Sequence, residues 1–319
     1  MTQRSTIEWC AHTWNPVTGC TKLSPASPGC ANCYAATLAE RFRGTPGHYF
    51  EHGFDIALRP ERLPEPLRWR AARTVFVNSM SDVFHPQVPD TYIAHMFAVM
   101  QSCAAHTWII LTKRPARMRA LLNSDDFWST VTDVGVELSA TGPSRPQFAP
   151  DTGQRHHQLP HVWLGTSAEN QHWAQQRLPL LADTPAARRV LSAEPLLGPL
   201  SLPPALLAHL DWVIVGGESG AHAHPMHPDW PRTLRDQCVH AEVPFFFKQW
   251  GTWTPGHLVP TGTDTPDTFV DTDHQPLTPR PSHIHDFGDG HAAAHVGKGR
   301  AGRHLDGQLW EQRPPPHTF

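Results

Sequence analysis

Long apolar runs are absent from this 319-residue sequence, and charged residues make up only 17% of it. No run of 18 or more apolar residues occurs, which excludes a transmembrane helix. The first nine residues contain no apolar stretch of the kind that a secretory signal needs. We therefore expect a cytoplasmic protein with no membrane partner.

Basic residues are not in excess in this sequence, and lysine is scarce. Lys and Arg together number 26 against 29 Asp and Glu, which gives a formal net charge of −3. Only four of the basic residues are lysines. This balance argues against a strongly basic surface for nucleic acid, although it leaves room for a local basic patch.

Short apolar, β-branched runs recur along the chain, and most are followed by a turn and a helical stretch. This alternation predicts βαβ units around a parallel sheet whose strands are buried on both faces. The expected strands are residues 7–9, 54–58, 74–80, 107–112, 161–166, 188–192, 211–215 and 244–247. Six to eight strands suit a full or partial parallel (β/α) barrel, with an open doubly wound sheet as the alternative.

The chain divides into a barrel and an extension. Residues 1–254 carry the strand and helix signals, interrupted at 141–160 by a stretch without periodicity that we expect to be an inserted loop. Residues 255–297 are rich in Pro, Gly, Thr, Asp and His and predict an irregular excursion. Apolar and charged residues return at 298–310, so the end of the extension, 255–319, is expected to dock back onto the barrel.

Polar side chains follow most of the apolar runs, at the point where each predicted strand ends. In parallel α/β folds, ligands bind at the carboxyl ends of the strands. Helix caps and polar loops explain the serines at these places, but they explain the charged residues less well. We therefore expect an active site at this rim, with candidates Asn78, Ser79, Lys113, Glu169, Glu194, Glu218 and Lys248.

Cysteine is concentrated at the start of the chain, where four of the six cysteines fall within the first 33 residues. In a cytosolic chain such clusters indicate metal binding or catalysis more often than disulfides. Cys20, Cys30 and Cys33 have the spacing C-x9-C-x2-C, in the loop before a helix expected at 31–43. Three thiolates leave one position open, on a [4Fe–4S] cluster for a ligand or on zinc for a water.

The other cysteines leave alternatives open. With Cys10 as a fourth ligand the site would be closed and structural, and without any metal the thiols would simply be reduced. Cys103 and Cys238 lie in predicted helices and are expected to be packed small hydrophobes.

Several segments, spread in order over nearly the whole chain, match one family. On these segments the chain resembles a phage-associated three-cysteine family, first named from phage gene products, also found in bacteria and usually grouped near the radical SAM enzymes. The segments include residues 13–20 (TWNPVTGC), 28–35 (PGCANCYA), 77–82 (VNSMSD), 111–115 (LTKRP), 216–220 (GGESG) and 245–251 (FFFKQWG).

The resemblance implies an iron–sulfur enzyme of the radical SAM type. Cys20, Cys30 and Cys33 would ligate three irons of a [4Fe–4S] cluster, and the fourth iron would bind S-adenosylmethionine (SAM). Reductive cleavage of SAM would then give a 5′-deoxyadenosyl radical that modifies an unknown substrate. A separate electron donor or protein partner is expected as well.

The same interpretation gives roles to the rim residues. Tyr34, beside the last cysteine, is expected near the adenine of SAM. Asn78, Ser79 and Glu169 are expected to contact its ribose and amino-acid parts. The residues expected to bind substrate or transfer protons are Lys113, Arg114, Glu194, Glu218 and Lys248.

Two features depart from the usual radical SAM pattern. The usual spacing is C-x3-C-x2-C, whereas the first gap here is nine residues, and residues 25–27 resemble an insertion that a loop tolerates. A Gly-Gly-Glu run holds the SAM amino group in those enzymes after an early strand. Residues 216–218 form such a run late in this chain, so we do not equate the two.

A zinc-stabilised nucleic-acid-binding or accessory protein is the alternative from another class. Its support is the phage association, the 12 tryptophans and the basic run Lys113, Arg114, Arg117 and Arg119. Bases would stack on Trp, and Arg would contact phosphates. A DNA-lesion repair enzyme, by analogy with photoproduct lyases, is a further form of the iron–sulfur interpretation.

Overall fold

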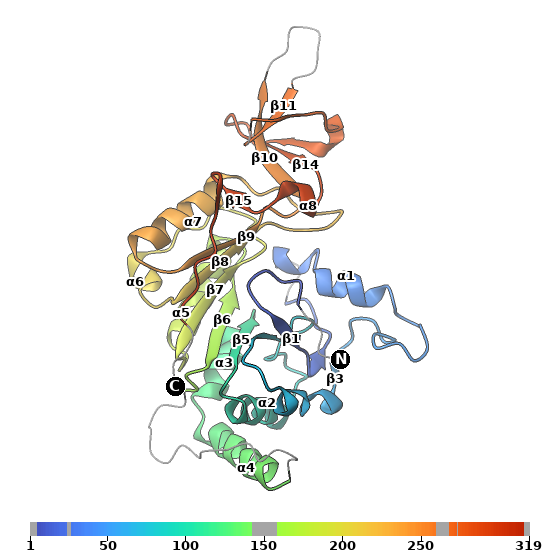
Figure 1. The fold of residues 1–319 in the computed structure, drawn as a ribbon, viewed down its shortest axis with the longest axis vertical. Helices are drawn as coiled ribbons and strands as arrows, with labels where there is room; N and C mark the ends of the chain where they lie inside the picture. The colour runs from blue at the N-terminus through green and yellow to red at the C-terminus, as the bar shows by residue number, and fades with distance from the viewer. Residues whose placement is uncertain (1–4, 24–26, 142–157, 260–267, 273, 316–319) are drawn as a thin grey trace.

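The computed structural model describes residues 5–23, 27–141, 158–259, 268–272 and 274–315, and its largest sheet within these ranges has seven parallel strands (Figure 1). In sheet order they are β1 (His12–Trp14), β4 (Thr74–Val77), β5 (Thr107–Thr112), β6 (Val162–Ser167), β7 (Arg188–Ala193), β8 (Trp212–Gly216) and β9 (Phe245–Gln249). The inserted loop expected at 141–160 lies mostly outside the described residues.

The order of these strands follows the chain without reversal. In a doubly wound sheet the order reverses at a switch point, and helices lie on both faces. Here each right-handed crossover moves the chain in the same direction, so the helices gather on one face and the sheet curls around the other. The fold is therefore a partial (β/α) barrel, which confirms the expected class and not the doubly wound alternative.

Helices cover the outer face of the curled sheet. They are α2 (Asp90–Ser102), α3 (Pro115–Leu122), α4 (Asp125–Thr141), α5 (Gln171–Ala182), α6 (Pro204–Leu207) and α7 (Asp229–His240). Alternate strand residues such as Trp108 and Ile110 join the helices in one large buried cluster, in which Ile93 and Phe97 of α2 also lie. No helix in the described part of the chain is long and apolar enough to cross a membrane.

Aromatic side chains fill the inner face of the sheet near the starts of the strands. Trp9, Trp163 and Phe246 pack around Trp212 with ring centroids 6.1, 6.0 and 6.0 Å from it, at interplanar angles of 86°, 88° and 88°. Edge-to-face packing of this kind is favoured by the ring quadrupoles. This cluster fills the interior where the strands begin, so the free space in the half-barrel lies where the strands end.

A second, antiparallel sheet replaces the irregular excursion that the sequence predicts at 255–297. In sheet order its strands are β12 (Pro276–Leu277), β11 (Thr268–Asp271), β10 (Trp253–Val259), β14 (Ala292–His295) and β13 (Ile284–Asp286), and a 3-10 helix, η4 (Pro281–His283), precedes β13. Most of the strands are short, and Pro255 and Gly256 inside β10 are residue types that sequence patterns assign to turns. The sequence therefore gives no strand signal here. Gly256 is required there, because a Cβ would stand 2.2 Å from the carbonyl oxygen of Val270.

The prediction of a strand at residues 7–9 is wrong. These residues form a turn, in which the Cys10 N–H donates to the Ile7 carbonyl at 3.2 Å, and the turn delivers Trp9 into the barrel interior. The strand begins later, at β1. The strand expected at 54–58 is also shorter and lies apart: β3 (Ala57–Leu58) pairs with β2 (Val17–Thr18), and the 3-10 helices η2 (Pro60–Arg62) and η3 (Glu65–Arg68) then lead to β4.

The last described residues lie against the edge of the main sheet. After α8 (Lys298–Ala301), β15 (His304–Leu305) and β16 (Gln308–Leu309) form a hairpin. The Phe247 N–H of β9 donates to the Trp310 carbonyl at 2.8 Å, and Glu311 bridges to Phe246. The end of the extension therefore covers the exposed edge of β9.

Gly165 on β6 tests how tightly the inner face is packed. A Cβ there would stand 2.5 Å from the Val190 carbonyl oxygen and 2.6 Å from a Leu111 methyl carbon. We expect Gly165→Ala to lower the free energy of unfolding by about 1–3 kcal/mol, measured by urea denaturation. Gly299→Ala, where a Cβ meets nothing within 4 Å, is the matched control and should change it by less than about 0.5 kcal/mol. Equal effects would contradict the packing argument.

Candidate functional site

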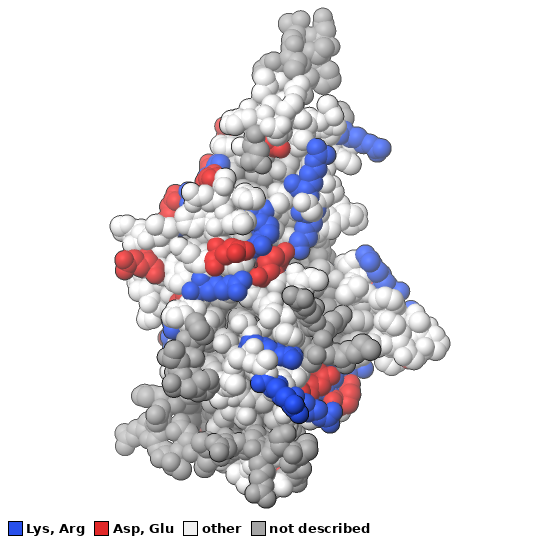
Figure 2. Space-filling view, in the orientation of Figure 1, with Lys and Arg blue, Asp and Glu red and all other residues white. Residues whose placement is uncertain are grey.

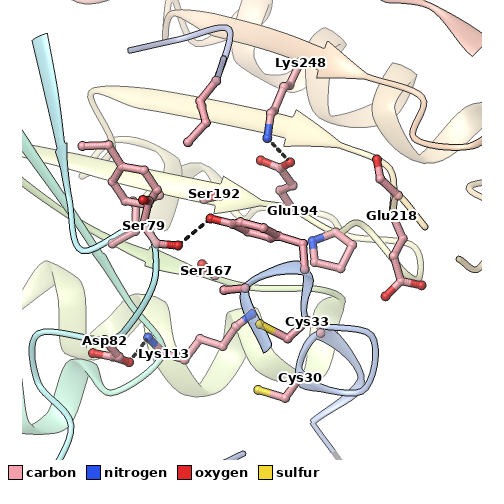
Figure 3. A pocket seen from close by; sticks show the side chains of 18 of the residues that line it. Cys30, Cys33, Ser79, Asp82, Lys113, Ser167, Ser192, Glu194, Glu218 and Lys248 are labelled. Carbon is pink, nitrogen blue, oxygen red and sulfur yellow. Dashed lines mark hydrogen bonds and ion pairs between the residues drawn. The ribbon is translucent and has the colours of Figure 1, made fainter. Parts of the chain in front are cut away.

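A cavity of about 420 Å³ lies at the carboxyl ends of the strands, between them and the cysteine loop (Figure 3). Eleven of the twelve predicted site residues line it, and Glu169 lies behind its wall. Those eleven are Cys20, Cys30, Cys33, Tyr34, Asn78, Ser79, Lys113, Arg114, Glu194, Glu218 and Lys248. The rim expected from the sequence is therefore one concave surface.

The cysteine loop forms one wall of this cavity. Cys30 ends a 3-10 helix, η1 (Pro28–Cys30), and Cys33 directly precedes α1 (Tyr34–Glu40), which is shorter than the helix expected at 31–43. The Ser27 hydroxyl donates to the Cys30 sulfur at 3.5 Å. The sequence motif thus places all three thiols along one cavity.

The spacing of the three sulfur atoms bears on the kind of metal centre they fit. Among the described His, Cys, Asp and Glu side chains, the sulfurs of Cys20, Cys30 and Cys33 do not come together within 4.8 Å of one another. Tetrahedral zinc with Zn–S bonds near 2.3 Å needs sulfurs only about 3.8 Å apart. A [4Fe–4S] cluster binds each thiolate to a separate iron, so it places a looser demand on the spacing of the sulfurs than one zinc ion does.

Cys10 lies outside this group. It is buried among the apolar residues inside the barrel, it does not line the cavity, and its sulfur donates to the Ser5 hydroxyl at 3.3 Å. Burial raises the pKa of its thiol to about 11. The closed four-cysteine site therefore receives no support from the geometry.

A buried ion pair lies at the Cys20 corner. The Arg114 guanidinium donates to an Asp82 oxygen at 2.9 Å and to the Cys20 sulfur at 3.5 Å. Burial and the nearby Asp82 carboxylate raise the pKa of the Cys20 thiol to about 11, while Arg114 opposes that shift. Without a metal the thiol is therefore protonated at neutral pH.

Glu169 takes a different place from the one predicted. It is fully buried between Lys113, whose ammonium group it contacts, and Arg177, whose guanidinium is 3.0 Å away. A Cβ on Gly29 of the cysteine loop would stand 2.4 Å from a Glu169 oxygen, so the loop packs directly on this carboxylate. Glu169 supports the loop from behind and does not face the cavity.

Glu218 holds the other side of the loop. One of its carboxylate oxygens accepts from the Asn32 amide at 3.1 Å, from the His224 backbone N–H at 2.8 Å and from the His224 ring at 2.7 Å. The Asn32 amide also donates to the His222 carbonyl at 2.7 Å. Glu218 lines the cavity, but its hydrogen bonds join the loop after β8 to the cysteine loop.

Glu194 and Lys248 meet at one end of the cavity, where they come from the ends of β7 and β9. The Lys248 ammonium donates to a Glu194 oxygen at 2.5 Å (Figure 3). Ser192 and Ser167 lie in the cavity wall between this pair and the cysteine loop. This end of the cavity therefore combines a charged pair with hydroxyl groups.

An aromatic ring and a buried amide line the cavity next to the cysteines. The Tyr34 hydroxyl donates to the Ser79 carbonyl at 2.5 Å, while its side chain stays 56% exposed. Asn78 adopts a positive φ of 59° and is 2% exposed, and within the described ranges neither its amide oxygen nor its amide nitrogen has a hydrogen-bond partner. A buried polar group without a partner costs about 1–3 kcal/mol in stability. Such a group needs an explanation, and a ligand that bonds to it is one.

One family model, described as "Protein of unknown function (DUF5131)", matches residues 4–314. The chain belongs to this family. Its description names no activity, and nothing among the curated proteins matches the chain. The phage link expected from the sequence stays a prediction.

Two solved structures show weak likeness to this member of the DUF5131 family. A spore photoproduct lyase complexed with a dinucleoside spore photoproduct has 8% identity and a TM-score of 0.36, over 86% of this chain and 72% of the other. A chitinase-like agglutinin from Robinia pseudoacacia has 10% identity and a TM-score of 0.23, over 70% and 80%. TM-scores this low carry no functional argument, so function must be argued from the site.

Sequence reasoning missed three residues that complete the site of this DUF5131 protein. Arg177 lies in the middle of α5 and carries no local signal. Asn32 stands between two of the cysteines, and its position in the motif could have singled it out. Lys298 comes from the extension and reaches Glu8 at 3.2 Å beside the cavity, a contact that no local pattern indicates.

The basic run and the tryptophans, which favoured nucleic-acid binding in the sequence, make contacts within the fold. Figure 2 shows Lys and Arg in separate groups on this face, several beside Asp or Glu. Each member of the basic run has a carboxylate partner: the pairs are Lys113 with Glu169, Arg114 with Asp82, Arg117 with Asp90, and Arg119 with Asp183. All 12 tryptophans are buried or half-buried, so none of them presents an exposed face for a base.

A further group of metal-ligating types, His227, Asp229 and His291, lies near the second sheet. The Asp229 backbone N–H donates to Nδ1 of His227 at 3.1 Å, so Nε2 carries the ring proton and donates to Asp289 at 2.8 Å. A histidine that binds a metal must keep the lone pair of one ring nitrogen free, and here Nδ1 accepts from the Asp229 N–H while Nε2 donates to Asp289. The group is therefore a hydrogen-bonded tie between α7 and the second sheet.

Glu169→Gln separates a supporting role from a ligand contact. The substitution leaves the buried Arg177 and the half-buried Lys113 without a counter-charge, so we expect a loss of about 3 kcal/mol or more in the free energy of unfolding, measured by urea denaturation. Asp183→Asn is the matched control, because it breaks the solvent-exposed pair with Arg119 and should lower stability by less than about 1 kcal/mol. A Glu169→Gln variant as stable as this control would refute the supporting role.

Proposed function

We propose that this protein is an iron–sulfur enzyme of radical-SAM-like type, in which Cys20, Cys30 and Cys33 hold a [4Fe–4S] cluster. The observation that carries the proposal is the set of three thiols along one cavity at the mouth of a partial barrel. The neighbouring Cys10 is engaged elsewhere, and a cluster with a separate iron for each thiol does not need the sulfurs to meet around one point as a zinc ion does. When bound and reduced, such a cluster supplies the electron that cleaves SAM and starts radical chemistry on a substrate.

The wall beside the cysteines supports a place for the adenosyl part of SAM. The Tyr34 ring is exposed to the cavity and is fixed by its hydroxyl bond to the Ser79 carbonyl, so a planar base could stack on it with little loss of side-chain entropy. The buried amide of Asn78 offers a donor and an acceptor that nothing in the described chain occupies. An amide of this kind suits the edge of an adenine or the hydroxyls of a ribose.

The charges of the wall favour a small zwitterionic or cationic ligand over a polyphosphate. Four acids and four bases line the cavity, so its side chains carry no net charge before the thiols are counted. Deprotonated thiols would make it negative. The eight residues are Glu8, Asp82, Glu194 and Glu218 with Lys113, Arg114, Lys248 and Lys298.

The Glu194–Lys248 pair supplies the means to move a proton at the substrate end. The Lys248 ammonium holds a proton, and the Glu194 carboxylate can accept one, at a separation of 2.5 Å. When Lys248 gives a proton to one atom of a substrate and Glu194 takes a proton from another, the pair becomes a neutral amine and a neutral acid. Its net charge stays at zero, so the exchange carries no charge penalty in a partly dry site.

Two of the partners expected from the sequence belong to this proposal. Reduction of the cluster needs an electron from outside the chain, so a separate electron donor is required. Nucleic acid as the substrate has the weaker support, because the basic run and the tryptophans are engaged within the fold.

Metal content is the first test of the proposal. Protein purified without oxygen should carry an oxygen-labile brown centre with about four irons and matching sulfide per chain. Ala at Cys20, Cys30 or Cys33 should abolish this centre, whereas Cys103→Ala, Cys238→Ala and Cys10→Ser should keep it. Stoichiometric zinc without sulfide would overturn the iron–sulfur assignment, and loss of iron in Cys10→Ser would instead indicate a closed four-cysteine centre.

SAM dependence is the second test. Adding SAM to the reduced protein should change the EPR signal of the cluster, and a strong reductant should then release 5′-deoxyadenosine and methionine. Cys33→Ala should lose both effects. Glu194→Ala and Lys248→Ala should keep the EPR change and impair only the turnover of substrate. A fully loaded, reducible cluster whose signal ignores SAM, and which releases no 5′-deoxyadenosine, would refute the radical-SAM part of the proposal.

A further inference from the structure

The Arg114 guanidinium donates hydrogen bonds to three groups: the Cys20 sulfur, the Asp82 carboxylate and the Thr21 carbonyl. Its Nη1 donates to the Cys20 sulfur at 3.5 Å and to an Asp82 oxygen at 2.9 Å, and its Nη2 donates to the Thr21 carbonyl at 2.9 Å. The planar fork of arginine can make these bonds together, because its donors have a fixed geometry. Arg114 therefore contacts both the cysteine and the backbone that follows it.

Asp82, the ion-pair partner of Arg114, is held by residues at the ends of the strands and not by the cysteine loop. The Asp82 carboxylate accepts from the Thr112 hydroxyl at 2.7 Å, from the Phe84 N–H at 3.0 Å and from the Lys113 N–H at 3.1 Å. Only 11% of the Arg114 side chain and 8% of the Asp82 side chain are exposed. The position of the guanidinium is thus set by the ends of β4 and β5.

The Cys20 corner differs from the Cys30 corner in the charge of its donor. Cys30 accepts from the neutral Ser27 hydroxyl, whereas Cys20 has a cation as its donor. Hydrogen bonds to a cluster's sulfurs, and the charge near it, are among the factors that set its reduction potential. A charge-assisted N–H bond is also about twice as strong as a neutral one.

We propose that Arg114 is a positioning residue that raises the reduction potential of the cluster through its hydrogen bond to Cys20. This inference rests on the proposed function, because it needs the cluster. The reduced cluster carries one more negative charge than the oxidised cluster, so a fixed cation at a ligand sulfur stabilises the reduced form more. Arg114 would thus make the cluster easier for an electron donor to reduce.

The test compares Arg114→Gln and Arg114→Lys with the wild-type protein and with Arg119→Gln. Arg119 lies on the same helix and pairs with Asp183 at the exposed surface, so its variant removes the same charge away from the sulfurs. Iron and sulfide contents are measured first, and the midpoint potential is then measured by an EPR-monitored redox titration. We expect a lower potential in Arg114→Gln, an intermediate value in Arg114→Lys and the wild-type value in Arg119→Gln.

The outcomes separate this inference from the proposed function. A wild-type protein that never holds iron and sulfide refutes the proposed function itself. A loaded wild-type protein, together with a loaded Arg114→Gln variant of unchanged potential, refutes only the role of Arg114. If Arg114→Gln does not fold or does not bind iron and sulfide, the Arg114→Lys variant provides the test. A lowered midpoint potential in Arg114→Lys supports the role of Arg114, and a wild-type potential refutes it.

Discussion

Three buried carboxylates fix the position of the cysteine loop, because a carboxylate removed from water needs cations or N–H donors around it. Asp82, Glu169 and Glu218 follow β4, β6 and β8, so they reach the loop from alternate strands of the sheet. Their partners connect sheet and loop: Arg114 bridges Asp82 to the first cysteine, the loop packs on Glu169, and Asn32 donates to Glu218. The surroundings of these carboxylates therefore tie the sheet to the cysteine loop, directly at the Cys20 thiol through Arg114 and at the backbone around Gly29 and Asn32.

The fold is predictable from the sequence where the local residue pattern matches the burial of the element. It is not predictable where the two differ. Residues 107–112 are β-branched and apolar and form β5 with the expected bounds, because a strand buried on both faces needs only that composition. β10 and β14 cannot be found this way. Their pairing joins residues about 40 positions apart, β10 contains Pro255 and Gly256, and β14 is a run of small alanines. Antiparallel pairing of such short strands depends on tertiary contacts that composition does not record.

The membership of the site is predictable from topology, but the task of each residue is not. Parallel strands bring their carboxyl ends together, so polar residues at those ends converge whatever the loops do. Whether a side chain then faces the cavity or supports the loop depends on neighbours distant in sequence. Glu169 is turned into a support by Arg177 on α5, and Glu218 is engaged by Asn32 of the cysteine loop. A rim position alone contains no such information.

The two ends of the cavity are held with very different strength. At the cysteine end, ion pairs shielded from water keep their geometry, because solvent and salt screen them little. At the opposite end, Lys298 of the extension meets Glu8 near the start of the chain at 3.2 Å, and Lys298 is about half exposed. An exposed pair of this kind contributes at most about 1 kcal/mol, so it adds little to the rigidity of this end. Under the proposed function, the cysteine end therefore suits a cofactor that needs fixed ligands, and the end beneath the Lys298–Glu8 pair suits a substrate that must enter and leave.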